Sequence, residues 1–136
     1  MADARPPRGL VDTSVLIDVE RLDPAQLPLE LAISAISMAE LAAGPHATAD
    51  PAERARRQDR LQRAEATFEA LPVDAAVARA FGRVYAAIHS AGRKARGRRA
   101  MDLLIAATAI AAGLPLYTRN PHDFANLGEL LDIVAV

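Results

Sequence analysis

Apolar and polar residues alternate along the chain in blocks that predict strands and helices in turn. An apolar run over residues 9–12 ends in Asp12 and leads into residues 13–21, where apolar positions recur at helical spacing. Residues 29–36 are apolar and partly β-branched, which is typical of a buried strand. The N-terminal part of the chain is therefore expected to fold as strand, helix and strand.

A helix is predicted directly after this second strand. Ser37 and Glu40 have the S-x-x-E spacing of a capping box, and the helix that starts there is expected to stop at Gly44. In this interpretation the Glu40 side chain reaches back to the backbone of the first turn, so its role is structural.

Two further helices occupy the middle of the chain. Asp50 and Pro51 predict the start of an arginine-rich amphipathic helix that runs to about Leu71, and residues 72–74 predict a short strand edge. Asp74 then caps a helix with an apolar stripe of 3.6-residue period. The members of this stripe are Val77, Phe81, Val84, Tyr85 and Ile88.

The C-terminal part continues the alternation. A helix from about Ala100 to Ala112 ends at Gly113, and two apolar segments over residues 114–118 and 130–136 predict buried strands. Strands that alternate with helices indicate an α/β fold, in which a mostly parallel central sheet is covered by helices on both faces.

Composition adds limits on size and compartment. The 136 residues, 51% of them hydrophobic, fit a single domain over residues 1–136, with residues 1–8 as a flexible N-terminal extension. The longest apolar stretch, residues 103–117, is shorter than the about 20 residues that span a membrane. Cysteine is absent, which excludes a disulfide scaffold and is compatible with a reducing compartment. We therefore expect a cytoplasmic protein without membrane contact.

Charge is distributed unevenly, although the formal net charge is only -1. The charged residues within positions 1–50 are mainly acidic, whereas no acid lies between Asp74 and Asp102. That interval ends in a basic run suited to RNA phosphates, made of Arg93, Lys94, Arg96, Arg98 and Arg99. A solvated loop is the alternative explanation of the same run.

Four acids follow predicted strands or stand near helix starts, namely Asp12, Glu40, Asp102 and Asp123. Because the carboxyl ends of parallel strands line one crevice, acids that are scattered in the sequence can converge there. Carboxylates in one crevice repel each other unless a divalent cation neutralises them, and Mg²⁺ or Mn²⁺ prefers such oxygen ligands. The pattern predicts a metal site that acts on phosphodiesters.

Each acid also has a structural explanation. Asp12 fits a helix N-cap equally well, and Glu40 fits the capping box. Asp102 has apolar sequence neighbours, so its carboxylate needs a partner. Asp123 fits a turn after Pro121.

Four polar residues lie beside these acids in the sequence. Thr13 and Ser14 follow Asp12 directly, and such residues cap helices more often than they catalyse. Arg119 and Asn120 follow a predicted strand, where a guanidinium or an amide can contact phosphate or orient a ligand. Turn formation explains Asn120 almost as well.

The segments LVDTSVLID, ISMAEL and MDLLIAATAIAAGLPLYTRNPHDF, in this order, closely resemble the PIN-domain family, in particular the VapC-type ribonuclease toxins of bacterial toxin-antitoxin pairs. The resemblance spans nearly the whole chain and implies a three-layer sandwich with a parallel sheet. It also implies Mg²⁺-dependent cleavage of RNA that leaves 5′-phosphate and 3′-hydroxyl ends. Homodimerisation and inhibition by a cognate VapB-type antitoxin are further implications.

The resemblance also implies roles for the acids. Asp12 and Asp102 match the principal metal ligands, and Glu40 matches the third acid. Many members carry an acid directly after the threonine-arginine pair, whereas this chain has Asn120. Asp123 is the nearest acid that can substitute, either directly or through a water molecule.

Other functions are compatible with the same residues. A catalytically weak module that binds RNA or an antitoxin results if Asn120 has removed a needed ligand. A housekeeping RNA-processing nuclease uses the same site. A phosphomonoesterase with Asp12 as nucleophile lacks the expected D-x-D signature, because Ser14 stands two residues later.

Overall fold

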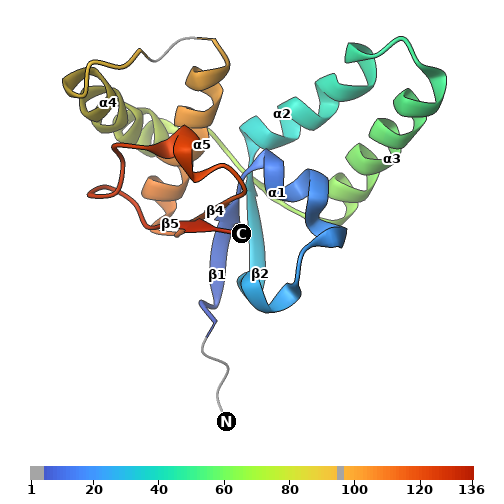
Figure 1. Cartoon of the computed structure of the whole chain (residues 1–136), viewed down its shortest axis with the longest axis horizontal. Coiled ribbons are helices and arrows are strands. Elements are labelled where there is room, and N and C mark those ends of the chain that lie inside the picture. Colours follow the sequence, from blue (N-terminus) through green and yellow to red (C-terminus); the bar gives the residue numbers. More distant parts are fainter. Residues whose placement is uncertain (1–4, 95–96) are drawn as a thin grey trace.

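The computed structural model of the chain describes residues 5–94 and 97–136 (Figure 1). The described part is built on a five-stranded sheet in the order β3-β2-β1-β4-β5, in which every neighbouring pair is parallel. The strands are β1 (Arg8–Val11), β2 (Glu30–Ser34), β3 (Ala70–Leu71), β4 (Leu116–Thr118) and β5 (Ile133–Ala135). The predicted parallel α/β sheet is confirmed.

Helices connect these strands. The α-helices of the described residues are α1 (Thr13–Asp18), α2 (Ala35–Ala43), α3 (Pro51–Thr67), α4 (Ala75–Ser90) and α5 (Arg98–Ala112). Short 3₁₀ helices are η1 (Val19–Arg21), η2 (Pro24–Gln26), η3 (Gly44–Ala47) and η4 (Pro121–Phe124). None of the helices described is long and apolar enough to cross a membrane.

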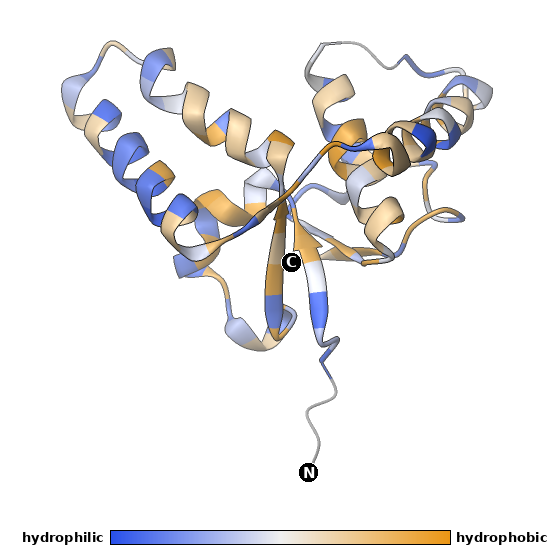
Figure 2. Cartoon of the chain, turned by 180° about the vertical axis from the view of Figure 1, so that it is seen from behind, coloured by the Kyte–Doolittle hydropathy of each residue, from blue (hydrophilic) through white to orange (hydrophobic). Residues whose placement is uncertain are grey.

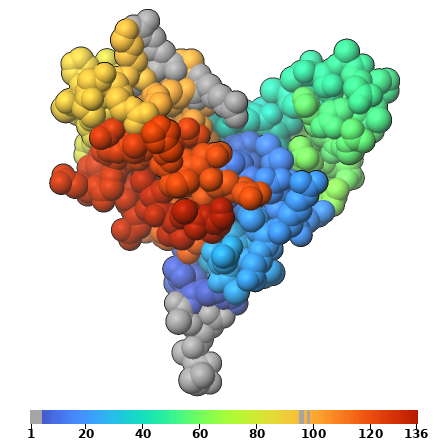
Figure 3. Space-filling model, viewed as in Figure 1, coloured from blue at the N-terminus to red at the C-terminus, as the bar shows by residue number. Residues whose placement is uncertain are grey.

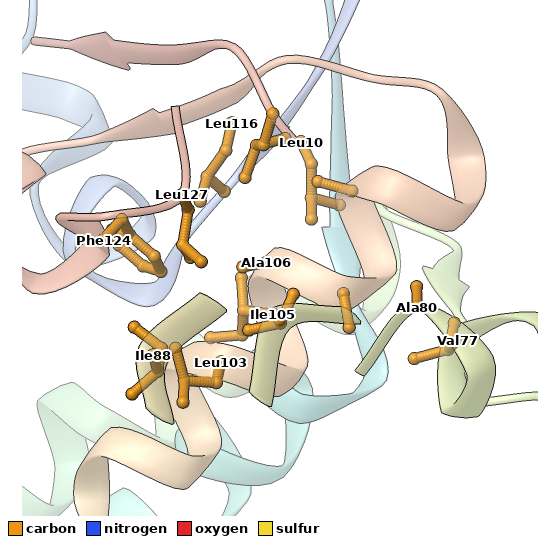
Figure 4. Packing of buried hydrophobic residues seen from close by; sticks show 14 of the residues in the cluster. Leu10, Val77, Ala80, Ile88, Leu103, Ile105, Ala106, Leu116, Phe124 and Leu127 are labelled. Atoms are coloured by element: carbon orange, nitrogen blue, oxygen red, sulfur yellow. The ribbon is translucent and has the colours of Figure 1, made fainter. Parts of the chain in front are cut away.

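Both faces of the sheet are buried under helices. Successive residues of a strand point to opposite faces, so they belong to different cores. Leu10 and Leu116 belong to a core formed with α4 and α5, and Figure 4 shows them facing Ala106 of α5. Val11 and Tyr117, the next residues along the same strands, belong to a second core formed with α1, α2 and α3. The predicted three layers are thus helices, sheet and helices.

Two glycines are required by their surroundings. A Cβ atom on Gly9 of β1 would lie 2.5 Å from the Cε1 atom of Tyr117, so only glycine lets this ring pack against the strand. Gly113 ends α5 in the left-handed conformation, with φ of 68°, as expected for a residue that closes a helix.

The predicted boundary between β2 and α2 is wrong by several residues. The Ser34 hydroxyl caps α2 by accepting the backbone N–H of Ser37 at 3.0 Å, so Ala35 and Ile36 are helical and not part of the strand. Ser37 therefore lies inside the first turn and forms no capping box with Glu40. The structural role that the sequence analysis gave to Glu40 is removed.

The end of α3 is also earlier than predicted. The helix ends at Thr67, and Phe68 follows in an extended conformation with its ring packed against the second core. The short strand β3 then pairs with the end of β2, whereas the sequence placed a strand edge at residues 72–74. Burial of an aromatic ring overrides helical continuity at this point.

Three smaller corrections concern exposure and element ends. Tyr85 belongs to the predicted apolar stripe of α4 but is 49% exposed. Helix α5 begins at Arg98, so Asp102 stands in its second turn and not at its start. Pro6 and Pro7, which the sequence analysis assigns to a flexible extension, accept hydrogen bonds through their carbonyl oxygens from the backbone N–H groups of Leu29 and Glu30.

The molecule has two arms that diverge from the carboxyl end of the sheet (Figure 1). One arm is the α2–α3 hairpin, whose α3 is largely hydrophilic (Figure 2), and the other contains α4 and α5. The space-filling view shows an open notch between the arms, above the place where β1 leads into α1 (Figure 3). The notch lies at the carboxyl end of the sheet, which is the edge where the sequence predicts the four acids.

Candidate active site

Three adjacent strands each end in a buried polar residue or lead directly into one. Ser34 ends β2, Asp12 follows β1 and Thr118 ends β4, and their exposed fractions are 0%, 6% and 0%. The chain moves from β1 to β2 on one side and returns to β4 on the other side of β1, so β1 and β4 flank the topological switch point. Ligands of open α/β sheets bind at such a point.

Asp12 is held by three hydrogen bonds from uncharged groups. Its Oδ1 atom accepts the Ser14 hydroxyl at 2.5 Å and the Val15 backbone N–H at 3.2 Å, and its Oδ2 atom accepts the Thr118 hydroxyl at 2.6 Å. The bond from Val15 makes Asp12 the N-cap of α1. Oδ1 therefore forms the cap, whereas Oδ2 accepts one hydrogen bond among the described residues, from the Thr118 hydroxyl.

The loop after β4 is attached to the same carboxylate through two hydroxyls. Ser14 Oγ accepts the backbone N–H of Arg119 at 3.2 Å, and Thr118 Oγ1 accepts that of Asn120 at 2.9 Å. Each hydroxyl therefore uses its proton for Asp12 and a lone pair for the loop. This arrangement fixes the direction of the chain as it leaves β4.

Glu40 is joined to the Asp12 region through Thr13. The Thr13 hydroxyl donates to Glu40 Oε1 at 2.8 Å, and it lies 3.0 Å from the buried Ser37 hydroxyl. Because Thr13 is the neighbour of Asp12 in the chain, this bond brings two of the four predicted acids to one end of the sheet.

Asp102 and Asp123 lie on elements that pack around the same region. Helix α5, which carries Asp102, contacts α2, and η4, which carries Asp123, contacts α5. Both residues are partly buried. Asp123 is in the first turn of η4, where its backbone N–H donates to the carbonyl of Asn120 at 3.0 Å.

The donors at this edge suit a hard divalent cation, which takes carboxylate oxygens. Asp12 is a buried carboxylate, and within the described residues it forms no ion pair with an arginine or lysine. Across residues 5–94 and 97–136, however, no three His, Cys, Asp or Glu side chains are grouped closely enough to hold one ion. The structure joins Asp12 to Glu40, and it does not close the four acids into a ligand cluster.

The predicted basic residues have varied surroundings. Arg93 donates to Asn126 at 3.3 Å, Lys94 is exposed, and the Nη1 atom of Arg99 is buried with no hydrogen-bond partner among the described residues. Arg96 and the side chain of Arg98 lie outside what the structure describes.

Arg119 has a protein partner. Its guanidinium pairs with Asp18 of α1 at 2.7 Å, and its side chain is 39% exposed. The predicted contact with RNA therefore competes with an ion pair that links the end of β4 to α1.

Three site residues were missed by the sequence analysis: Ser34, Ser37 and Thr118. Each is a small hydroxyl residue with an exposed fraction of 0%, set at or just after the end of an apolar strand. A polar residue in such a position needs a hydrogen-bond partner inside the protein, which is the signal that could have identified it.

The pKa values of two side chains, one on β4 and one on α3, are shifted by their surroundings. Burial raises the pKa of Tyr117 in β4. Hydrogen bonds from Arg56 and Arg57 lower the pKa of Glu53 on α3.

A groove of about 370 Å³ between α1 and α3 is lined by other charged residues, including Asp18 and Arg63, and not by the four predicted acids.

Comparison with known protein families assigns the chain to one family. A model of the PIN domain matches residues 9–130. The chain belongs to the PIN-domain family. It is 38% identical to ribonuclease VapC5 of Mycobacterium tuberculosis over 125 residues, which cover 90% of this chain and 89% of that relative. It is 40% identical to ribonuclease VapC8 of the same species over 102 residues, or 74% of this chain and 89% of the relative.

Solved structures agree with this assignment to the PIN-domain family. VapBC-5 of Mycobacterium tuberculosis, described as a member of the VapBC family of toxin-antitoxin systems, superimposes with a TM-score of 0.84 at 37% identity, covering 96% of this chain and 100% of that chain. VapBC2 of Rickettsia felis, bound to a DNA fragment from its promoter, has a TM-score of 0.74 at 23% identity and covers 95% and 98%. The predicted PIN-like sandwich is confirmed.

Proposed function

We propose that this PIN-domain chain is the ribonuclease toxin of a toxin-antitoxin pair and cleaves RNA with a divalent cation. The observation that carries the proposal is the buried Asp12 carboxylate at the switch point of the sheet, bound by uncharged donors and joined through Thr13 to Glu40. A relative that is 38% identical is named a ribonuclease, which supports the same chemistry.

Asp12 and Asp102 are proposed as the principal ligands of Mg²⁺, or of Mn²⁺ in its place. Glu40 is proposed as the third acid, and Asp123 as an acid that acts through a water molecule because Asn120 occupies the position after Arg119. When bound, such a cation polarises the phosphoryl oxygen, activates water and stabilises the leaving oxygen. The hydroxyls of Ser14 and Thr118 orient the Asp12 carboxylate for this task.

RNA is proposed to bind through its phosphates. Arg93, Lys94, Arg96, Arg98 and Arg99 supply positive charge before and within the first turn of α5, one turn from Asp102. The chain is only 4% aromatic, so reading of many bases by stacking is not expected. Arg119 joins the RNA contacts when its pair with Asp18 opens.

Partners follow from the solved relatives. VapBC-5 is a toxin-antitoxin system, and we propose that this chain likewise binds a VapB-type antitoxin that neutralises it. Homodimerisation and a cytoplasmic location are part of the same proposal and stay predictions.

Cleavage of RNA by the purified chain tests the proposal. Labelled RNA is incubated with Mg²⁺ and with wild type, Asp12→Asn, Asp102→Asn or Asp132→Asn. Asp132 is the matched control, because it is an exposed acid directly before β5, at the amino and not the carboxyl end of that strand. We expect wild type and Asp132→Asn to leave 5′-phosphate ends, and the two site variants to lose at least about a hundredfold in rate, since each removes a charged ligand.

Two results would contradict this function. Full cleavage by Asp12→Asn or Asp102→Asn would remove those acids from the site. Tight binding of RNA without cleavage by folded wild type, at any Mg²⁺ or Mn²⁺ concentration, would favour the alternative of a catalytically weak binding module.

A further inference from the structure

Four side chains form a continuous row of hydrogen bonds from the end of β2 to Glu40. Ser34 Oγ lies 3.5 Å from Ser37 Oγ, Ser37 Oγ lies 3.0 Å from Thr13 Oγ1, and Thr13 Oγ1 lies 2.8 Å from Glu40 Oε1. The two serines are fully buried. The row therefore connects the interior of the protein to the partly exposed acid.

The proton order in this row is determined by its two ends. An ionised carboxylate only accepts hydrogen bonds, so the single Thr13 proton goes to Glu40. Thr13 then accepts the proton of Ser37. The Ser34 oxygen already accepts the backbone N–H of Ser37 at 3.0 Å, so the proton of Ser34 is free to point to Ser37. Every hydroxyl in the row donates toward Glu40.

We propose that Ser37 is a positioning residue for Glu40, acting through Thr13. Ser37 touches neither Asp12 nor Glu40 by any hydrogen bond of the described residues, yet it fixes the Thr13 hydroxyl with its proton on the side of Glu40. Donors in a row polarise each other, so the bond that Glu40 receives is stronger and better directed than one from an isolated hydroxyl. Glu40 is thereby kept turned toward the Asp12 end of the sheet.

Two hydroxyl residues serve each of the two acids, and one residue of each pair comes from the segment Asp12-Thr13-Ser14. Ser14 and Thr118 orient Asp12, whereas Thr13 and Ser37 orient Glu40. The inference rests on the proposed cation site, because positioning of Glu40 matters for function only if its carboxylate serves a bound ion.

Binding of Mn²⁺ in the absence of RNA tests the inference. The dissociation constant is measured by calorimetry or electron paramagnetic resonance for wild type, Ser37→Ala, Glu40→Gln and the double variant. We expect Ser37→Ala to weaken Mn²⁺ binding about tenfold, as losses behind a ligand do. In the Glu40→Gln background the same change should have an effect of less than about twofold, because coupled residues are not additive.

A second pair of variants covers the case in which Ser37→Ala does not fold. Thr13→Val removes the hydroxyl at almost constant shape and should weaken Mn²⁺ binding about tenfold, while Thr13→Ser keeps the hydroxyl and should bind about as tightly as wild type. Thr108→Val is the matched control, since the buried Thr108 hydroxyl bonds to the Leu104 carbonyl inside α5 and belongs to no site contact.

The outcomes separate the inference from the proposed function. The positioning role is overturned if Asp12→Asn abolishes Mn²⁺ binding but Ser37→Ala leaves it unchanged. It is also overturned if Ser37→Ala weakens Mn²⁺ binding by the same factor in the wild-type and in the Glu40→Gln background. If the coupling is observed while wild type cleaves no RNA, the positioning role stands and the proposed ribonuclease activity fails.

Discussion

At the scale of single residues, the geometry of Asp12 is compatible with both roles that the sequence presents as alternatives, helix cap and proposed metal ligand. Its Oδ1 atom caps α1 through Val15, and its Oδ2 atom receives the Thr118 hydroxyl at the switch point between β1 and β4. A cap needs one oxygen, so the second is left for another partner. The cap and the candidate ligand are therefore compatible in one side chain.

Residue types near strand ends were predictable, but their pairing was not. The sequence identified Asp12 and Glu40 from their positions after apolar runs, and the structure joins them through Thr13. It did not identify Thr118, whose role depends on two contacts, one of them 106 residues distant in the chain. Such contacts arise only when β1 and β4 become neighbours.

Thr118→Val should destabilise the fold. The change keeps the side-chain volume but leaves the backbone N–H of Asn120 and one oxygen of Asp12 without this partner in a buried site. We expect the free energy of unfolding in urea to fall by about 1–3 kcal/mol. Thr108→Val, which removes a buried hydroxyl bonded to an already paired helix carbonyl, should cost less than about 1 kcal/mol. Equal losses in the two variants would contradict this role of Thr118.

At the scale of elements, the order of strands and helices was predictable because hydrophobic periodicity is local. The residues at which these elements begin and end were less predictable. The sequence pattern indicates Ser37 as the cap of the helix after β2, whereas Ser34 caps α2 in the structure and is the last residue of β2 that pairs with β3. The early end of α3 has a similar cause, since Phe68 is drawn into the core.

The basic segment before and at the start of α5 should contribute to RNA affinity and not to the chemical step. Replacing Arg93, Lys94, Arg96, Arg98 and Arg99 together by Gln should weaken RNA binding and flatten its dependence on salt, because fewer counterions are released. Single-turnover cleavage at saturating RNA should persist. A control with Arg56→Gln and Arg60→Gln on α3 should bind RNA as wild type does.

Binding isotherms from about 50 to 200 mM salt provide the measurement for this segment. An unchanged slope in the five-residue variant would show that the basic run is only a solvated surface. A lost single-turnover rate at saturating RNA would instead place one of these residues in the chemistry.

At the scale of the whole molecule, the candidate site lies where the order of the strands in the parallel sheet reverses. The order β3-β2-β1-β4-β5 sets the switch point beside β1, and the two arms leave a notch above it (Figure 3). The elements that carry or flank the four acids contact one another in series, since α1 contacts β4 and α2, and α5 contacts α2 and η4. The sequence predicted the fold class, whereas the convergence of the four acids on one ion stays a prediction, because no three such side chains are grouped within the described residues.

We propose that a divalent cation binds at the carboxyl end of β1 between Asp12 and Asp102. The most direct measurement is a crystal structure of the protein with Mn²⁺, in which anomalous scattering locates the ion. We expect a peak about 2 Å from a carboxylate oxygen of Asp12 and of Asp102, with Glu40 directed at the same ion. A map with Mn²⁺ at other residues, or with none near Asp12 at a concentration that supports cleavage of RNA, would contradict a cation site at Asp12 and Asp102.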